Sequence, residues 1–321
     1  MKKIIALALT VFMVFSATAC GSEATKTTTV PTDVSTDPIE TTAALVEPTA
    51  PAGTVPETLP ATNEPESAGS LGDFGVEIHD YVITEDRNGT PVILIAYTFT
   101  NNSDESESAA HNLYFEAYQN GIGLDGAYFV EYDGYDVEAE MRDVKNGVSV
   151  DLMAAFTLSD PTAPVQFEVT ELISFSNDVI GKTFYISDET SIELDQAPVG
   201  DFVAEVGDYI VSIVSYSITE NHKGEPVLYV ELGFSNNGNE SRQFASAISF
   251  DAFQDGIELD TAYLMDDDSG ESQMRDVKPG AGTLVTMVFE LSNTTSVVEI
   301  EIEEAISFSD NVITTELVIA E

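Results

Sequence analysis

Apolar and polar residues alternate along several short stretches of the chain. Between Leu228 and Phe234 every second residue is Leu, Val or Phe, and between Val298 and Glu303 a Val or Ile alternates with Glu. A period of two places alternate side chains on opposite faces of a β-strand. No apolar stripe at helical spacing persists beyond two turns. The pattern therefore predicts an all-β protein built from short antiparallel strands.

Two short words between apolar runs predict tight hairpins. "YQNGIGL" contains Asn120-Gly121, and "FQDGIEL" contains Asp255-Gly256. Asn-Gly and Asp-Gly tolerate the positive φ that two-residue hairpin turns require. With about seven short strands on either side of such turns, each half of the chain is expected to form an antiparallel β-sandwich.

The chain contains an internal repeat. Residues 88–125 align without gaps on 223–260, with 16 of 38 positions identical, and residues 141–180 align on 274–313, with 19 of 40 identical. The chain therefore carries two copies of one domain of about 120 residues, which is an ordinary size for a single domain.

The limits of the two copies follow from a second match. Gly72-Asp73-Phe74 recurs as Gly200-Asp201-Phe202, which suggests a boundary near residues 196–200. We therefore expect two tandem domains, 72–197 and 198–321.

The word MRDVK occurs in both copies, at 141–145 and at 274–278, and is followed by Asn-Gly and by Pro-Gly. Both pairs suit a turn whose second central residue has positive φ. The word is thus expected to end one strand and turn into the next. We expect its Arg and Lys to neutralise acidic neighbours within the same repeat. The alternative is a small cationic site for a carboxylate or a phosphate.

The N-terminus has the features of an export signal. Lys2 and Lys3 precede an apolar run that ends at Phe15, and small residues lead to Cys20, the only cysteine. The run is too short to span a membrane. The site resembles a bacterial lipobox, so residues 1–19 are expected to be a lipoprotein signal peptide and Cys20 to carry the lipid anchor. The alternative is ordinary cleavage after the Ala-Thr-Ala of residues 17–19.

Residues 20–71 are rich in Thr, Pro and Glu and lack strand or helix periodicity. Such a composition predicts a disordered linker. The formal net charge of the chain is −46, with 57 acidic against 11 basic side chains. So acidic a protein repels nucleic acid, which is therefore excluded as a direct partner.

No motif predicts catalysis. The chain has no G-x-S-x-G word, no phosphate-binding glycine loop and no second cysteine for redox chemistry. His79, His111 and His222 align with non-histidine residues of the other copy, so no histidine site is duplicated. We expect a protein that is not an enzyme and has no cofactor.

Acidic loops precede each MRDVK word and are the best metal-site candidates. Ca²⁺ takes six to eight oxygen ligands, and extracellular modules can bind it weakly. Solvated surface loops are the simpler interpretation, because neither loop has EF-hand spacing. The candidate calcium ligands are Asp133, Asp136, Asp266, Asp267, Asp268 and Glu271.

Several spaced words carry a family resemblance. They are "GTPVILIAYTFTNNSDE" and "GEPVLYVELGFSNNGNE", "AYQNGIGLD" and "AFQDGIELD", "DVKPG", and "ISFSNDVI" and "ISFSDNVI". Both copies resemble an immunoglobulin-like domain of unknown function found in lipoproteins of Gram-positive bacteria, similar to telokin-like lipoprotein domains. Asn146 departs from the usual proline. The resemblance implies an immunoglobulin-like sandwich on a surface lipoprotein and brings no catalytic or ligand residues.

Together these features predict a protein anchored by lipid on the extracellular face of the cell membrane. It would display two immunoglobulin-like modules with a binding or structural role, and its partner would be a cell-wall polymer or a surface protein. The alternative is a calcium-responsive adhesion or wall-associated module.

Overall fold

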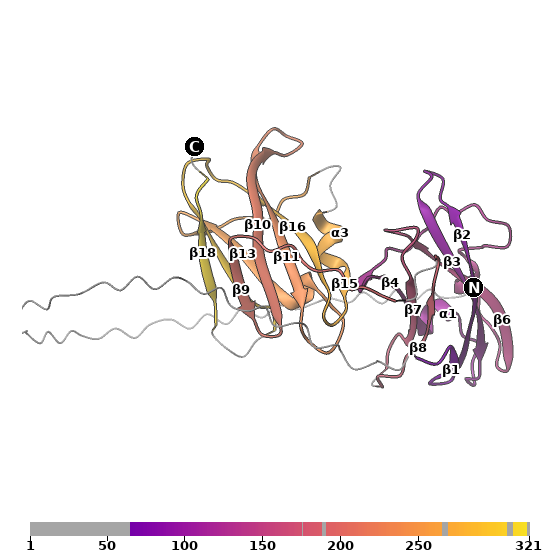
Figure 1. The fold of residues 1–321 in the computed structure, drawn as a ribbon. Coiled ribbons are helices and arrows are strands. Elements are labelled where there is room, and N and C mark those ends of the chain that lie inside the picture. The colour runs from indigo at the N-terminus through magenta and orange to yellow at the C-terminus, as the bar shows by residue number, and fades with distance from the viewer. Residues whose placement is uncertain (1–64, 175, 188–190, 265–268, 307–310, 320–321) are drawn as a thin grey trace, which may run out of the picture. The chain divides into compact units, whose positions relative to one another are not determined.

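The computed structural model describes residues 65–174, 176–187, 191–264, 269–306 and 311–319 (Figure 1). All of them belong to one compact unit, Leu59–Glu321. The expected signal peptide, Cys20 and residues 21–64 of the expected linker lie outside the described residues. None of the described helices is long and apolar enough to cross a membrane.

The first repeat consists of two antiparallel sheets. One has the order β1-β2-β3-β6, from β1 (Ala68–Leu71), β2 (Phe74–Glu85), β3 (Pro91–Asn101) and β6 (Val148–Thr157). The other contains β5 (Ile122–Gly123), β4 (Leu113–Gln119), β7 (Val165–Glu171) and β8 (Ile180–Phe184). The sheets pack face to face, since the rings of Phe156 and Phe167 lie 5.9 Å apart, centroid to centroid. Short helices are α1 (Ala109–Asn112) and the 3-10 turn Ala139–Met141.

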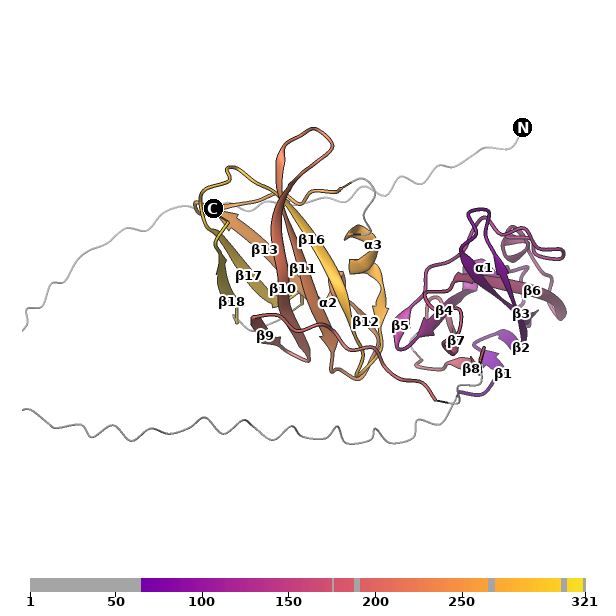
Figure 2. The same ribbon diagram turned by 45° about the horizontal axis from the view of Figure 1, so that its top comes forward.

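The second repeat has the same layers (Figure 2). Its first sheet is β16-β11-β10-β9, from β9 (Phe202–Val206), β10 (Tyr209–Glu220), β11 (Pro226–Asn236) and β16 (Gly282–Glu290). Its second sheet is β14-β13-β17-β18, from β13 (Ile248–Gln254), β14 (Ile257–Glu258), β17 (Val298–Glu304) and β18 (Ile313–Leu317). The remaining elements are β12 (Arg242–Gln243), α2 (Phe244–Ala247), α3 (Ser269–Met274) and β15 (Asp276–Val277).

The alternation seen in the sequence corresponds to buried faces. Leu228, Val230, Leu232 and Phe234 of β11 are fully buried, as are their counterparts in β3. Val298, Ile300 and Ile302 of β17 are also fully buried, and the glutamates between them lie on the other face. The prediction of an all-β chain with two tandem antiparallel domains is confirmed.

The start of each repeat differs from expectation. Gly72 (φ 55°) lies in the turn between the paired residues Leu71 and Phe74. Gly207 (φ 58°) lies in the equivalent turn of the second repeat, between the paired residues Val206 and Tyr209. Gly72-Asp73-Phe74 therefore corresponds to Gly207-Asp208-Tyr209, and the proposed match to residues 200–202 is wrong. Strand β1 also lies ahead of residue 72, within the expected linker. The short shared word misled because Gly-Asp-Phe occurs by chance near the true turn.

Both predicted kinds of turn are present. The hairpin residues Asn120 (φ 52°), Gly121 (φ 84°), Asp255 (φ 54°) and Gly256 (φ 79°) all have positive φ, as a type I′ turn requires. After each MRDVK word the lysine carbonyl accepts a hydrogen bond from the backbone N–H three residues later, at 3.1 Å in the first repeat and 3.0 Å in the second. Gly147 and Gly280 supply the positive φ in these turns.

Candidate functional site

The second MRDVK word forms a contact with the first repeat. Strand β15 pairs with β5, with Val277 opposite Ile122. The backbone N–H of Lys278 donates to the carbonyl of Gly121 at 2.8 Å. A single hydrogen-bonded sheet, β12-β15-β5-β4-β7-β8, therefore contains strands of both repeats.

Two ion pairs accompany this strand pairing. Lys278 Nζ lies 2.6 Å from Glu168 Oε1, and these side chains are only 16% and 20% exposed. The same ammonium lies 4.2 Å from the centroid of the Tyr118 ring, within the range of a cation–π interaction. Arg275 Nη2 lies 3.3 Å from Asp125 Oδ2. The expectation that these charges serve their own repeat is wrong for Lys278, because the pairing of β15 with β5 brings Glu168 of the first repeat beside it.

The first MRDVK word has a different environment. Arg142 pairs with Asp136 of its own repeat, and both side chains are well exposed, at 65% and 45%. Lys145 is exposed and forms no ion pair with any residue that the structure describes. The expectation of neutralisation within the repeat is thus confirmed for Arg142. One sequence word therefore has two roles, set by whether a neighbouring hairpin covers it.

The hairpin fits closely into the second repeat. A Cβ added to Gly121 would lie 2.7 Å from Cβ of Ala281 and 2.8 Å from Cδ2 of Leu194, so only glycine fits there. Ile122 and Leu194 pack against the apolar core of the second repeat. The Asn-Gly pair predicted the hairpin, but no local pattern predicted this packing, because the contacting residues are far apart in the chain.

Carboxyl groups near the contact titrate abnormally. Burial raises the pKa of Glu116, although its carboxylate accepts a 2.7 Å hydrogen bond from the hydroxyl of Tyr118. Burial also raises the pKa of Asp276. Elsewhere in the first repeat, burial raises the pKa of Glu140, which accepts a 2.7 Å hydrogen bond from Tyr97. In each case folding favours the protonated carboxyl.

These shifts predict how stability depends on pH. An acid whose pKa is raised by folding binds more protons in the folded than in the unfolded state between its ordinary and raised pKa, so stability falls as pH rises through that window. We expect the free energy of unfolding to increase as the pH falls from neutral toward the ordinary pKa of these carboxyls. Glu140→Gln should raise stability at pH 7 and flatten the dependence, measured by urea denaturation at each pH. The exposed Glu138→Gln controls for the general loss of negative charge, and equal profiles for the two variants would contradict the prediction.

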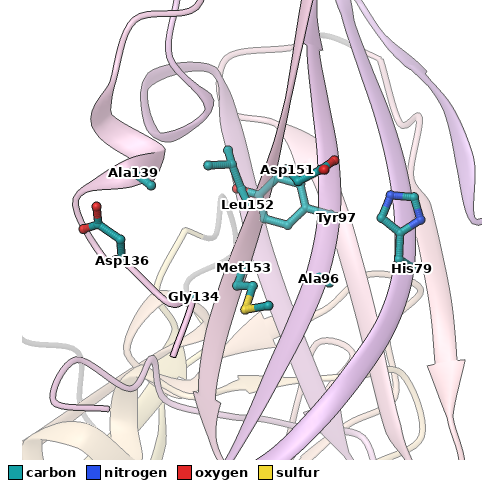
Figure 3. A pocket seen from close by; sticks show the side chains of 9 residues that line it. All are labelled: His79, Ala96, Tyr97, Gly134, Asp136, Ala139, Asp151, Leu152 and Met153. Atoms are coloured by element: carbon teal, nitrogen blue, oxygen red, sulfur yellow. The ribbon is translucent and has the colours of Figure 1, made fainter. Parts of the chain in front are cut away.

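A pocket of about 330 Å³ lies on the first repeat (Figure 3). His79 Nε2 and the hydroxyl of Thr98 are 2.7 Å apart, and that hydroxyl donates to Asp151 at 2.7 Å. At the positions of His79 and Asp151 the second repeat has Val214 and Leu284, so the polar groups of the pocket are not duplicated. The pocket offers polar contacts to a small ligand and presents no nucleophile beside a base.

The predicted calcium ligands do not gather in the described structure. Asp133 and Asp136 are exposed on one loop, where Asp136 pairs with Arg142, and Glu271 is exposed on α3 of the other repeat. Asp266, Asp267 and Asp268 lie outside the described residues. Among the residues that the structure describes, no three His, Cys, Asp or Glu side chains are grouped so that they could hold a metal ion.

The chain belongs to the family described as "Domain of unknown function (DUF5067)", which matches residues 54–171 and 187–304. The two matches confirm the duplication inferred from the sequence. No curated protein matches the chain.

Two solved structures resemble one repeat's length of the chain. One is described as a "putative lipoprotein from Staphylococcus aureus subsp. aureus NCTC 8325", with 11% identity and a TM-score of 0.32 over 38% of this chain and 92% of that chain. The other is a protein from Enterococcus faecalis, with 16% identity and a TM-score of 0.31 over 39% of this chain and 94% of that chain. At these TM-scores the likeness carries no conclusion about this chain.

Proposed function

We propose that this chain is a lipid-anchored, non-catalytic protein of the extracellular cell surface. In this proposal its two repeats are immunoglobulin-like modules that act as one coupled unit with a binding or structural role. The observation that supports coupling is the pairing of β15 with β5, together with the ion pair between Lys278 and Glu168. Independent modules on a flexible chain would not need a partly buried charge pair between them.

The proposal of a lipid anchor is based on the N-terminal sequence. A basic start, an apolar run and small residues before a single cysteine suit export followed by lipidation of Cys20. Cys20→Ser is expected to move the protein from the membrane fraction to the medium and to abolish labelling by a radioactive fatty acid. Ala17→Ser, which keeps the cysteine, serves as the control. Equal labelling of the Cys20→Ser chain and the unchanged chain would rule out the anchor.

A binding role at the surface would use cell-wall polymer or a surface protein as partner. The net charge of −46 opposes contact with an anionic polymer except where basic side chains gather. Arg142 and Lys145 are exposed on the first repeat and form such a place. Retention on isolated wall material should therefore fall when both are changed to Gln. Unchanged retention would favour a structural role without this contact.

A further inference from the structure

We propose that chains of this protein join head to tail, with the hairpin at 254–259 of one copy docking on the MRDVK edge at 143–145 of the next. Each surface is the repeat-related counterpart of a surface that is already paired inside the chain. The first repeat uses its hairpin, and none of the residues that the structure describes pairs with the outer side of its MRDVK edge. The second repeat uses its MRDVK edge and leaves its hairpin open. The inference goes beyond the proposed surface role, because it names a second copy of the chain as the partner.

The open hairpin has the same construction as the paired one. Gln119 Nε2 fixes the base of the first hairpin by donating to two loop carbonyls, at 2.6 and 3.0 Å. Gln254 makes the corresponding bonds at 2.9 and 3.2 Å. Yet Ile257, the counterpart of the packed Ile122, is 69% exposed. A Cβ on Gly256 would meet nothing within 4 Å.

The open edge likewise matches the paired one. In the second repeat the side chain of Asn236 donates to the carbonyl of Val277 at 2.7 Å and holds β15 in place. Asn101 donates to the carbonyl of Val144 at the same distance. On its inner side Val144 pairs with Glu107, and Val277 pairs with Arg242. Glu107 and Arg242 occupy equivalent positions in the two repeats. The side of the segment that β5 occupies in the second repeat is therefore the open side in the first.

The charges on the two open surfaces are complementary. The partly buried pair Lys278–Glu168 has Lys145 and Glu301 as its repeat counterparts. The pair Arg275–Asp125 has Arg142 and Asp260. Phe253 replaces Tyr118, so an aromatic ring remains available to the lysine ammonium. The pair of Lys145 and Glu301 can thus form between two copies, whereas Arg142 already pairs with Asp136 of its own repeat.

Two positions differ and weaken the contact between chains. Gly123 lies against the backbone of Asp276, where an added Cβ would be 3.2 Å from its N and O atoms, and the second hairpin has Glu258 instead. Ala281, which faces Gly121, is replaced by Val148 in the first repeat. Association is also intermolecular and loses the advantage of a covalent link. The contact is therefore reversible and weaker than the internal one.

A contact between two different surfaces of one chain is heterologous. It builds a closed ring or an open filament according to the rotation of each step. Repetition needs no new surface, since every added chain presents another open hairpin and another open edge. A chain anchored by lipid would gain from a high local concentration at the membrane.

Sedimentation velocity tests the proposal on the chain from residue 21 onward, which contains the whole compact unit. Measurements run up to about 1 mM at physiological salt, where the net negative charge is screened. The average mass should rise with concentration. Val148→Ala with Glu258→Gly should strengthen association, because it restores the small residues of the internal contact. Lys145→Glu or Glu301→Lys should each weaken it by about 30-fold or more.

A mixing experiment separates this geometry from other self-association. The Lys145→Glu chain keeps a working hairpin, and the Glu301→Lys chain keeps a working edge. Each alone should remain monomeric, whereas their mixture should form longer assemblies in which the two chains alternate, because the natural charge pair and the reversed charge pair can both form there. A chain carrying both changes should again form longer assemblies. The proposal is overturned if the Val148→Ala, Glu258→Gly chain is monomeric throughout, or if Lys145→Glu leaves the assembly unchanged.

Discussion

Lys278→Gln is expected to destabilise the folded chain by about 2 to 4 kcal/mol, because it leaves Glu168 as a mostly buried carboxylate without its partner. Lys145→Gln, the same change in the same word of the first repeat, is expected to cost about 0.5 kcal/mol or less, since that side chain is exposed. The two variants share the word MRDVK and the type of turn that follows it, with Asn146 in one turn and Pro279 in the other. Their difference therefore isolates the contact between the repeats.

Urea denaturation measures both costs on the chain from residue 21 onward. Hydrogen exchange adds a local readout, because the amide of Lys278 donates to Gly121 and should lose protection when the contact opens. Removing both partners with Lys278→Gln and Glu168→Gln should cost less than the sum of the single changes. Equal stability losses for Lys278→Gln and Lys145→Gln would show that the contact contributes nothing.

Much of the fold could be predicted from the sequence. In a strand with one buried and one solvent-exposed face, apolar residues recur at every second position. The buried row from Leu228 to Phe234 and the hairpin at Asn120-Gly121 are examples. Local rules sufficed there because the strand and the turn are determined by adjacent residues. The duplicated words, in turn, established that there are two domains.

The contact between the repeats was not accessible in the same way. The second MRDVK word is identical to the first, yet Lys278 is 16% exposed and pairs with Glu168, 110 positions away. No local pattern distinguishes the covered copy from the open one. The only signals were small residues at two contact positions, Gly123 and Ala281, where the other copy has Glu258 and Val148. A difference between repeats at otherwise matched positions is therefore the feature that could have revealed the contact.

Gly121→Ala and Gly256→Ala form a matched pair for the packing of the hairpin. Both glycines have positive φ, 84° and 79°, so an alanine should cost about 1 to 2 kcal/mol at either turn through backbone strain alone. At Gly121 the new methyl group would also lie 2.7 Å from Cβ of Ala281, which has no rotamer that moves it away. At Gly256 it would meet nothing within 4 Å.

We therefore expect Gly121→Ala to cost about 1 to 3 kcal/mol more than Gly256→Ala, the range typical of overpacking. The excess should appear with loss of amide protection at Lys278, whereas Gly256→Ala should leave that amide protected. Adding Ala281→Gly to Gly121→Ala removes one of the two overlapping atoms and should recover part of the excess. Equal costs for the two alanine variants, with Lys278 protected in both, would mean that the hairpin of the first repeat does not seat in the second.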